Sequence, residues 1–403
     1  MHMMNDQGGM LIEREHAVVF QTYKRLPVAI AHAEGCRVTD VDGTSYLDML
    51  GGIAVNALGH SHPKVVEAVV DQARRYMHVS NFFYQEPQIR LAEALVEVSG
   101  YPRIFFSNSG AEATDGAIKM ARRFGSRQGR YDVIGFTGGF HGRTYGALSV
   151  MDKPLYKDGM GPFLPNTMVL PYNDVDALES RVDEHTAAVI LEFVQGEGGV
   201  TEATSEFVEA IWRLKERYGF MVIADEVQAG IGRTGTFFSF ERYGVRPDIV
   251  TVAKAMGGGL PLGGILATEE AAALFERGMH GTTYGGNALA CAAGAVVVEE
   301  VVDGLMAHVV EIGDYLRARL LDLQARMPDR IRELRGRGCM QGVVLTSDAA
   351  PVVTALLERR IIANATSGNV VRLVPPYVIS RAEVDEFVAT FGDALRATTA
   401  PAA

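Results

Sequence analysis

Short apolar segments alternate with helix-like segments through the middle of this 403-residue chain, and this alternation limits the possible folds most strongly. Between about residues 62 and 302 the apolar runs are RIFFSNS, DVIGFTG, TAAVILEFVQG, GFMVIADE and PDIVTVAK, with helical periodicities between them. Strands that alternate with helices form a mostly parallel sheet whose two faces are both covered by helices. The sequence therefore predicts an α/β fold for this region.

The two ends of the chain follow other patterns. Residues 36–50, CRVTDVDGTSYLDML, place Asp42-Gly43 between alternating apolar runs, which predicts an antiparallel hairpin with a left-handed two-residue turn. The last hundred residues contain a helical stretch at 301–327, the strand-like CMQGVVLTS, a helix near 350–360 and the strand-like NVVRLVP. They predict a smaller α+β unit.

The net charge and the cysteine content limit the possible binding partners and the possible cellular compartment. With 38 Lys and Arg against 49 Asp and Glu, the formal net charge is -11, which disfavours nucleic acid and anionic membranes as partners. The three cysteines form no C-x-x-C motif, and no stretch reaches the ~20 apolar residues of a membrane span. We therefore expect small-molecule partners and a cytoplasmic protein without a disulfide framework.

Lys254 is the first candidate for covalent chemistry. It follows the apolar run DIVTVA and precedes AMGGGLPLGG, so a lysine stands at a predicted strand end beside glycines that let the backbone approach a ligand. The chain has only seven lysines, and an amine is what Schiff-base chemistry requires. A solvated lysine at a loop entry is the alternative interpretation.

Asp225 ends the apolar run FMVIA, twenty-nine residues before Lys254. A carboxylate at the end of a buried strand needs a cationic partner or several donors. A lysine together with a carboxylate that can hold a protonated pyridine nitrogen is the pairing that pyridoxal phosphate requires. An aspartate that caps the following turn is the alternative.

A possible anion site lies in SNSGAEATDGAIKMARRFG. Ser109 and Glu112 have the spacing of a capping box, which predicts a helix that begins directly after Ser109. The backbone N–H groups of Gly110 and Ala111 would then bind a phosphate, with the helix dipole behind them. Many ordinary helices begin in the same way.

Competing motifs were weighed against this hypothesis. GIGRTG, residues 230–235, matches the dinucleotide fingerprint G-x-G-x-x-G, but it runs into TFFSF instead of an apolar helix. A nicotinamide-dependent dehydrogenase and a catalytically inactive binding protein remain as alternatives. His60 and His62 lie in GHSHP without a third clustered ligand, so we interpret them as loop or helix-start residues and predict no metal site.

Seven segments carry a family resemblance over nearly the whole chain. In order they are NSGAEA, GFHGRTYGALS, QGEGGV, ADEVQAGIGRTG, TVAKAMGGGLPLGG, HGTTYGGNALACAA and RLVPP. With them the chain resembles the class III pyridoxal-phosphate aminotransferases. The resemblance implies the fold type I architecture, with a large α/β domain at 62–303 and a small α+β domain built from 1–61 and 304–403. It also implies a homodimer whose active sites lie at the subunit interface.

The resemblance assigns the residues that hold pyridoxal 5′-phosphate. Lys254 matches the lysine that bonds covalently to the cofactor and later moves the substrate proton, and Asp225 matches the carboxylate that keeps the pyridine nitrogen protonated. The other implied contacts are Ser109, Gly110 and Ala111 at the phosphate, Thr283 at the phosphate of the neighbouring subunit, Phe140 stacked on the ring, and Gln228 near its phenolic oxygen.

The resemblance also implies how the substrates bind. Arg143 matches the guanidinium that binds the carboxylate far from the reacting carbon, and Arg372 the one that binds the near carboxylate of 2-oxoglutarate. Glu197 would mask Arg372 while the amino donor reacts, and Tyr23 matches a tyrosine found in ornithine-specific members. Arginine suits both roles because its planar fork pairs with a carboxylate in a bidentate manner. A surface ion pair is the alternative for each arginine.

The chain departs from the family pattern at Phe193 and Ala288, where proline is usual, and at Ala229, where threonine is common. None of these changes removes a charge or the lysine. Ile53 stands where ornithine-specific members carry a tyrosine for the free α-amino group, which favours an N-acylated donor.

The resemblance therefore implies transfer of the distal amino group of N2-acetyl-L-ornithine to 2-oxoglutarate. The products would be N-acetyl-L-glutamate 5-semialdehyde and L-glutamate, as in arginine biosynthesis. Succinylornithine, an N-acyl-lysine, succinyl-diaminopimelate, ornithine and 4-aminobutyrate are alternative donors for the same catalytic residues.

Overall fold

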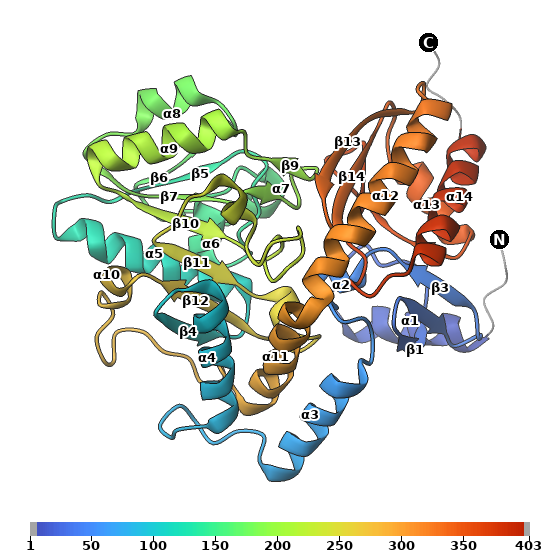
Figure 1. Ribbon diagram of the computed structural model, residues 1–403, viewed down its shortest axis with the longest axis horizontal. Helices are drawn as coiled ribbons and strands as arrows, with labels where there is room; N and C mark the ends of the chain where they lie inside the picture. The colour runs from blue at the N-terminus through green and yellow to red at the C-terminus, as the bar shows by residue number, and fades with distance from the viewer. Residues whose placement is uncertain (1–5, 399–403) are drawn as a thin grey trace.

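A seven-stranded sheet forms the centre of the molecule, in a computed structural model that describes residues 6–398 (Figure 1). Its strands in spatial order are β4 (Arg103–Ser107), β12 (Gly263–Ala267), β11 (Ile249–Val252), β10 (Met221–Asp225), β7 (Thr186–Leu191), β5 (Asp132–Phe136) and β6 (Thr167–Leu170). Neighbouring strands from β11 to β6 are parallel, and only β12 runs antiparallel to its neighbours in this sheet. The prediction of a mostly parallel sheet is confirmed.

Residues along the central strands alternate between two apolar clusters, because successive side chains of a strand point to opposite faces. Ala188 and Ile190 of β7 pack with α5 (Gly110–Ser126) on one face. Val189 and Leu191 belong to the cluster on the other face, which includes residues of α9 (Ser205–Tyr218) and α11 (Ala288–Glu300). The architecture is therefore a helix–sheet–helix sandwich.

Further helices surround the sheet and connect its strands. They are α3 (Pro63–Arg75), α4 (Glu86–Ser99), α6 (Tyr145–Ser149), α7 (Pro154–Lys157), α8 (Val175–Arg181), α10 (Glu269–Ala272) and the 3-10 turns at Ser239–Tyr243 and Lys254–Gly257. A short ribbon, β8 (Val194–Gln195) with β9 (Thr201–Glu202), follows β7. Among the helices of residues 6–398, none is long and apolar enough to cross a membrane.

Two smaller sheets involve the ends of the chain. One contains β1 (Ile30–Glu34), β2 (Arg37–Asp40), β3 (Ser45–Asp48) and β15 (Ile361–Ile362), and the other contains β13 (Ile331–Arg337), β14 (Met340–Leu345), β17 (Val370–Leu373) and β16 (Asn364–Thr366). β3 pairs in parallel with β15, so that segments from both ends share one sheet. The remaining helices are α1 (Asp6–Val18), α2 (Gly51–Ala54), α12 (Met306–Arg326), α13 (Ala350–Glu358) and α14 (Arg381–Ala397).

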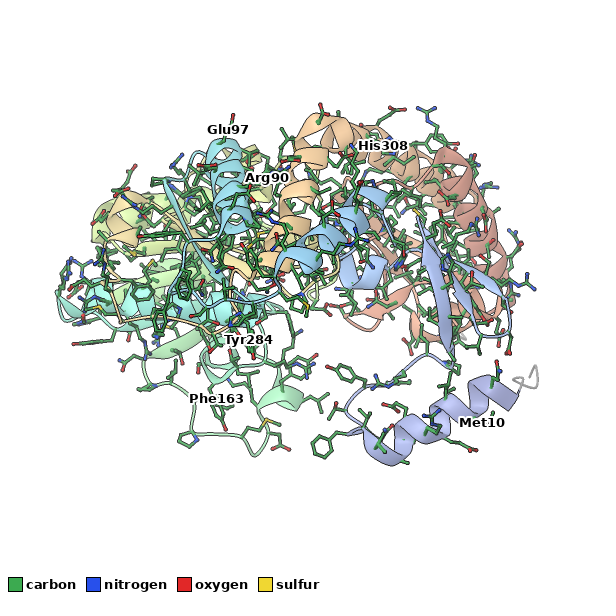
Figure 2. All side chains as sticks on the ribbon, turned by 90° about the horizontal axis from the view of Figure 1, so that it is seen from below. Met10, Arg90, Glu97, Phe163, Tyr284 and His308 are labelled. Carbon is green, nitrogen blue, oxygen red and sulfur yellow. The ribbon has the colours of Figure 1, made fainter. Side chains whose placement is uncertain are left out.

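Figure 1 shows α12, α13 and α14 beside β13 and β14, on the same side of the molecule as β1 and β3. The helix α1, which carries Met10, lies at the lower edge of the view in Figure 2. A π-helical turn at Val301–Leu305 joins α11 to α12, so the long helix predicted at 301–327 begins with an irregular turn.

The hairpin at 36–50 is confirmed, but the predicted two-residue turn is wrong. Asp40 and Thr44 still pair, and Gly43 N donates to Asp40 O at 3.0 Å, so three residues make the connection. Of these three, only Gly43 is left-handed, with φ of 82°. The Asp40 carboxylate accepts from the N–H groups of Asp42 and Thr44 and thereby stabilises the longer turn.

Candidate active site

A cavity of about 470 Å³ lies where β10 and β11 end. Seven of the predicted site residues line it: Ser109, Gly110, Ala111, Phe140, Arg143, Asp225 and Lys254. Parallel strands present their carboxyl ends at one edge of a sheet, and ligands bind in the crevice beyond that edge. β10 and β11 are adjacent and parallel, as the spacing between Asp225 and Lys254 predicted.

Lys254 occupies a strained position directly after β11. Its φ is 40°, in the left-handed region, and it begins the 3-10 turn that leads into the glycine-rich loop. Burial lowers the pKa of Lys254 from 10.5 to about 8, and the positive charge of Arg372 contributes to the same shift. A larger fraction of the amine is therefore neutral near neutral pH, which is the state that attacks a carbonyl carbon.

Asp225 lies at the end of β10 and is nearly inaccessible to solvent. Its Oδ1 atom accepts from Val227 N at 3.0 Å, and its Oδ2 atom lies 2.7 Å from His141 Nδ1. Burial alone lowers the pKa of His141, but the hydrogen bond and negative charge of Asp225 outweigh burial and raise it. The hydrogen bond with His141 thus gives the buried Asp225 carboxylate a polar partner, and the raised pKa favours the cationic form of His141.

His141 was not predicted as a site residue from the sequence. It lies in GFHGRT between two residues that were predicted, Phe140 and Arg143. The signal was present, because Asp225 was expected to need a cationic partner, but its position beside Asp225 depends on the crossing of segments 84 residues apart.

The beginning of α5 forms one wall of the cavity. Ser109 caps the helix, with its Oγ accepting from Glu112 N at 3.2 Å. A capping box also predicts a hydrogen bond from the backbone N–H of Ser109 to the Glu112 carboxylate. This prediction is wrong, because the Glu112 carboxylate accepts instead from the backbone and side-chain nitrogens of Asn108 at 2.8 and 2.9 Å. Within the described part of the chain, the N–H groups of Gly110 and Ala111 donate no hydrogen bond, so both can bind an anion.

Close packing restricts the beginning of α5 to a small residue. A Cβ atom on Gly110 would lie 2.7 Å from a methyl carbon of Val227, and a Cβ atom on Gly142 would lie 2.6 Å from the Cβ of Ala111. The backbone is therefore the surface that meets a ligand here.

A buried carboxylate fixes Phe140 on the cavity wall. Glu192 accepts from Phe140 N at 2.8 Å and from Gly196 N at 3.0 Å. Burial, followed by the charge of Asp225, raises the pKa of Glu192 to about 7. The neighbouring Phe193, which departs from the family pattern, is fully buried in an aromatic cluster.

Arg372, Glu197 and Gln228 form a polar cluster. Arg372 on β17 is 1% exposed, and its Nη1 atom donates to Glu197 Oε1 and, at 3.1 Å, to Gln228 Oε1. Burial raises the pKa of Glu197, but the charge and hydrogen bond of Arg372 outweigh burial and lower it. The predicted pairing of Glu197 with Arg372 is present in the structure. Arg372, Glu197 and Gln228 are not among the residues that line the cavity, although the charges of Arg372 and Glu197 both affect the pKa of Lys254, which does line it.

Arg143 differs from Arg372 because it is exposed at the cavity. Its guanidinium carbon lies 3.7 Å from the ring centroid of Tyr156 and 5.9 Å from that of Phe140. Across residues 6–398 no carboxylate pairs with Arg143, as judged by ion-pair distances. Its planar guanidinium group therefore stacks on the Tyr156 ring, while its N–H groups remain available to a carboxylate.

The structure does not place Thr283 or Tyr23 in this cavity. Thr283 is exposed, while the neighbouring Thr282 accepts from Asn108 Nδ2 at 3.0 Å. Tyr23 is 72% exposed and lines a separate hollow, together with Arg25 and residues of α1.

A left-handed turn lies next to the cavity and carries Ile53. Gly51, Gly52, Ile53 and Ala54 have φ between 55° and 66°, although left-handed backbone is costly for residues with a Cβ atom. The side chain of Asp48 accepts from the N–H groups of Leu50 and Gly51 and holds the entry of this turn. Val55, directly after the turn, lines the cavity.

Together these groups fit a flat, phosphorylated aromatic aldehyde. Free N–H groups at a helix N-terminus meet the phosphate, the Phe140 ring provides an aromatic surface, Asp225 provides a negative charge, and Lys254 an amine of lowered pKa. Among the described residues, no cluster of three metal-ligating side chains was found.

Comparisons with known proteins agree with this geometry. The family model described as Aminotransferase class-III matches residues 18–395. Acetylornithine aminotransferase of Caldanaerobacter subterraneus subsp. tengcongensis is 44% identical over 390 residues, covering 96% of this chain and 99% of the relative. The acetylornithine aminotransferase of Archaeoglobus fulgidus is 45% identical over 378 residues, covering 94% and 98%.

Solved structures are also similar. The ornithine aminotransferase of Toxoplasma gondii has a TM-score of 0.93 at 30% identity and covers 98% of this chain and 96% of its own. The acetylornithine aminotransferase of Elizabethkingia anophelis has a TM-score of 0.86 at 31% identity and covers 97% and 99%.

Proposed function

The chain belongs to the class III aminotransferases, which depend on pyridoxal 5′-phosphate, and we propose that it transfers the distal amino group of N2-acetyl-L-ornithine to 2-oxoglutarate. The products are N-acetyl-L-glutamate 5-semialdehyde and L-glutamate. The observation that carries the proposal is the convergence of Lys254, Asp225 and the free N-terminus of α5 on one cavity. Relatives that are acetylornithine aminotransferases support the choice of donor.

The residues that would hold the cofactor are those that line the cavity. Gly110 and Ala111 would bind its phosphate through backbone N–H groups, Phe140 would stack on its ring, and Asp225 would pair with its ring nitrogen. When bound, pyridoxal phosphate supplies a carbonyl group for the amine and a ring that withdraws electrons from the bond to be broken.

Lys254 then has two tasks that its surroundings support. Its lowered pKa provides a neutral amine for covalent attachment, and the same nitrogen, once released, can take a proton from one carbon and return it to another. Asp225, paired with His141, would hold the positive charge of the cofactor's ring nitrogen in place.

Two arginines at different depths would let one pocket accept both substrates. Arg143, exposed and unpaired, would bind the distant carboxylate of either substrate. Arg372 would bind the carboxylate next to the reacting carbon of 2-oxoglutarate or glutamate after Glu197 moves away. Because the backbone oxygen of Glu197 is held by Thr366 Oγ1 at 2.7 Å, the carboxylate can swing while the loop stays in place.

We propose that a second copy of the chain completes each site and that Thr283 and Tyr23 act only in this homodimer. Both side chains are exposed in the single chain. Phe82 and Tyr84, which are 93% and 99% exposed, offer the apolar surface that a dimer would cover. The same proposal includes three further assignments. They are the small domain formed by 1–61 with 304–403, the cytoplasmic location and the place in arginine biosynthesis.

A panel of amino donors assayed with 2-oxoglutarate tests the function. The panel contains acetylornithine, succinylornithine, succinyl-diaminopimelate, ornithine and 4-aminobutyrate. The highest kcat/KM is expected with acetylornithine, because Ile53 offers no polar partner to a free α-amino group. A higher kcat/KM with another donor would replace the proposed substrate, and absence of glutamate formation with every donor would refute the proposed function.

A further inference from the structure

The GIGRTG loop, residues 230–235, has no role in the chemistry described so far. No helix follows it directly, since the next element is the 3-10 turn at Ser239–Tyr243, and this argues against a dinucleotide site. Instead, the loop places the side chain of Arg233 in the interior, where it is 0% exposed.

Arg233 connects the loop to two segments near the end of the chain. Its Nη1 atom donates to the carbonyl oxygens of Cys339, at 3.1 Å, and of Pro375. Its own carbonyl oxygen accepts from Cys339 N at 3.0 Å. The guanidinium carbon lies 4.3 Å from the ring centroid of Tyr377, whose hydroxyl donates to Ile231 O at 2.8 Å.

The stability of the fold alone does not account for an arginine at this position. No carboxylate lies within ion-pair distance of Arg233 in the described residues, and its Nε and Nη2 atoms have no hydrogen-bond partner there. A permanently charged, partly unsatisfied group in the interior is destabilising, and an apolar side chain of similar volume is often equal or better for stability. A role in the site would explain its presence.

The contacts of Arg233 lead to the substrate-binding arginine. Pro375 follows Arg372 by three residues and lies two residues beyond the end of β17. At the other end, the loop begins five residues after Asp225, and Gln228 in the connecting segment accepts from Arg372 at 3.1 Å. Two segments are thus joined, the one that carries Asp225 and the one that carries Arg372. The contacts between them are made by Gln228, by Arg233 and by the hydrogen bond from Tyr377 to Ile231.

We propose that Arg233 is a positioning residue that fixes Arg372 relative to Asp225 and Lys254, and thereby sets where the α-carboxylate of the oxo acid binds. The proposal rests on the proposed function, because it assigns Arg372 to that carboxylate. Arg233 itself is not among the residues that line the cavity.

The test separates the two half-reactions in the holoenzyme with Arg233→Met and Arg233→Lys. Displacing a binding group by about 1 Å can cost up to ~100-fold, so the concentration of 2-oxoglutarate for half-maximal rate should rise about 10- to 100-fold in Arg233→Met. The rate with acetylornithine, which does not use Arg372, should stay within about 3-fold. Arg233→Lys keeps the positive charge but loses the planar guanidinium group. The 2-oxoglutarate concentration for half-maximal rate should therefore lie between that of the wild type and that of Arg233→Met.

Arg330 provides a matched control. It is 6% exposed, and its Nη1 and Nη2 atoms donate to the carbonyl and hydroxyl oxygens of Thr398 at 2.8 Å, not to the segment 372–375 that Arg233 contacts. Arg330→Met should lower the melting temperature without changing the ratio of the half-reactions. Equal loss of both half-reactions in Arg233→Met, or the same change of ratio in Arg330→Met, would overturn the proposal.

A binding measurement does not depend on turnover. Glutarate should raise the melting temperature of the wild-type holoenzyme through Arg143 and Arg372, and less so in Arg233→Met. If Arg233→Met does not fold, Tyr377→Phe removes the bond to Ile231 and should weaken 2-oxoglutarate binding about 3- to 10-fold; unchanged binding would count against the proposal. Wild-type enzyme without transaminase activity would refute the proposed function instead.

Discussion

Glu197→Gln is the substitution that tests the electrostatics of the site most sharply. It keeps the shape of the side chain but removes the negative charge that pairs with Arg372. Because Arg372 is almost fully buried, its guanidinium then retains only neutral partners among the described residues, including Gln228 Oε1 at 3.1 Å, Asn364 Oδ1 at 3.2 Å and Gly196 O at 3.3 Å. The guanidinium becomes more available to an α-carboxylate, so the variant should prefer glutamate as amino donor more than the wild type does.

The size of the change is bounded by the ion pair that is lost, since the glutamine oxygen can still accept a hydrogen bond from Arg372. A hydrogen bond to a charged group contributes about 1.5–3 kcal/mol. Since 1.4 kcal/mol corresponds to a factor of ten, the ratio of kcat/KM for glutamate to that for acetylornithine should rise about 10- to 100-fold. Glu197 also raises the pKa of Lys254, so this pKa should fall further in the variant.

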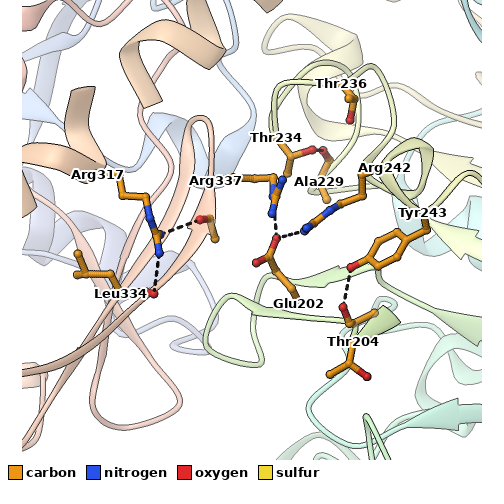
Figure 3. Close-up of polar contacts among 12 residues, drawn as sticks. Glu202, Thr204, Ala229, Thr234, Thr236, Arg242, Tyr243, Arg317, Leu334 and Arg337 are labelled. Atoms are coloured by element: carbon orange, nitrogen blue, oxygen red, sulfur yellow. Dashed lines mark hydrogen bonds and ion pairs between the residues drawn. The ribbon is translucent and has the colours of Figure 1, made fainter. Parts of the chain in front are cut away.

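Stopped-flow absorbance of each half-reaction measures the ratio, and Glu202→Gln is the control. Glu202 also pairs with arginines, accepting from Arg242 at 2.6 Å and from Arg337 at 2.8 Å, but it makes no hydrogen bond to Arg372 (Figure 3). The control should leave the ratio unchanged. A ratio in Glu197→Gln within about 2-fold of the wild type would refute the assignment of Glu197 as the group that masks Arg372.

Three further predictions concern other parts of the site. Covalent capture of pyridoxal phosphate by the apoprotein should accelerate as the pH rises toward about 8 and level off above it, because Lys254 is protonated below its pKa; a midpoint near 10.5 would contradict the lowered value. Asp225→Asn should reduce turnover at least about 100-fold while the circular dichroism spectrum stays unchanged, since the negative charge opposite the ring nitrogen is lost; near wild-type turnover would exclude the role of Asp225. Ile53→Gly should increase the free energy of unfolding by roughly 0.5–1 kcal/mol, because it relieves a left-handed φ of 65°. The same substitution should raise KM for acetylornithine. A lower free energy of unfolding in urea denaturation would show that Ile53 is not strained.

The sequence was sufficient to predict the central sheet and the position of its chemistry. Parallel strands are buried on both faces, so their apolar runs are visible in the sequence, and the polar residues that end them predicted Asp225 and Lys254 at one edge. β6 and β12 of this sheet were not predicted, and the β12 sequence GGILA follows a glycine-rich loop. The glycines that suggested a loop in fact allow close packing against β4 and Ser109.

Contacts between distant segments could not be derived from local patterns. The pairing of His141 with Asp225 and the contacts of Arg233 with Pro375 join residues 84 and 142 positions apart. The hairpin turn was mispredicted for a local reason, because the Asp40 side chain stabilises a three-residue connection that the Asp-Gly pair alone does not indicate. The role predicted for Thr283 lies in the neighbouring subunit, so the contacts within one chain do not bear on it.

Reduction with borohydride followed by peptide mass spectrometry tests the central claim most directly. The holoenzyme should carry the mass of one reduced phosphopyridoxyl group on the peptide that contains Lys254, and Lys254→Ala should carry none. A phosphopyridoxyl group on Lys153 or any other lysine, or a wild-type chain that retains no group after reduction, would contradict the account.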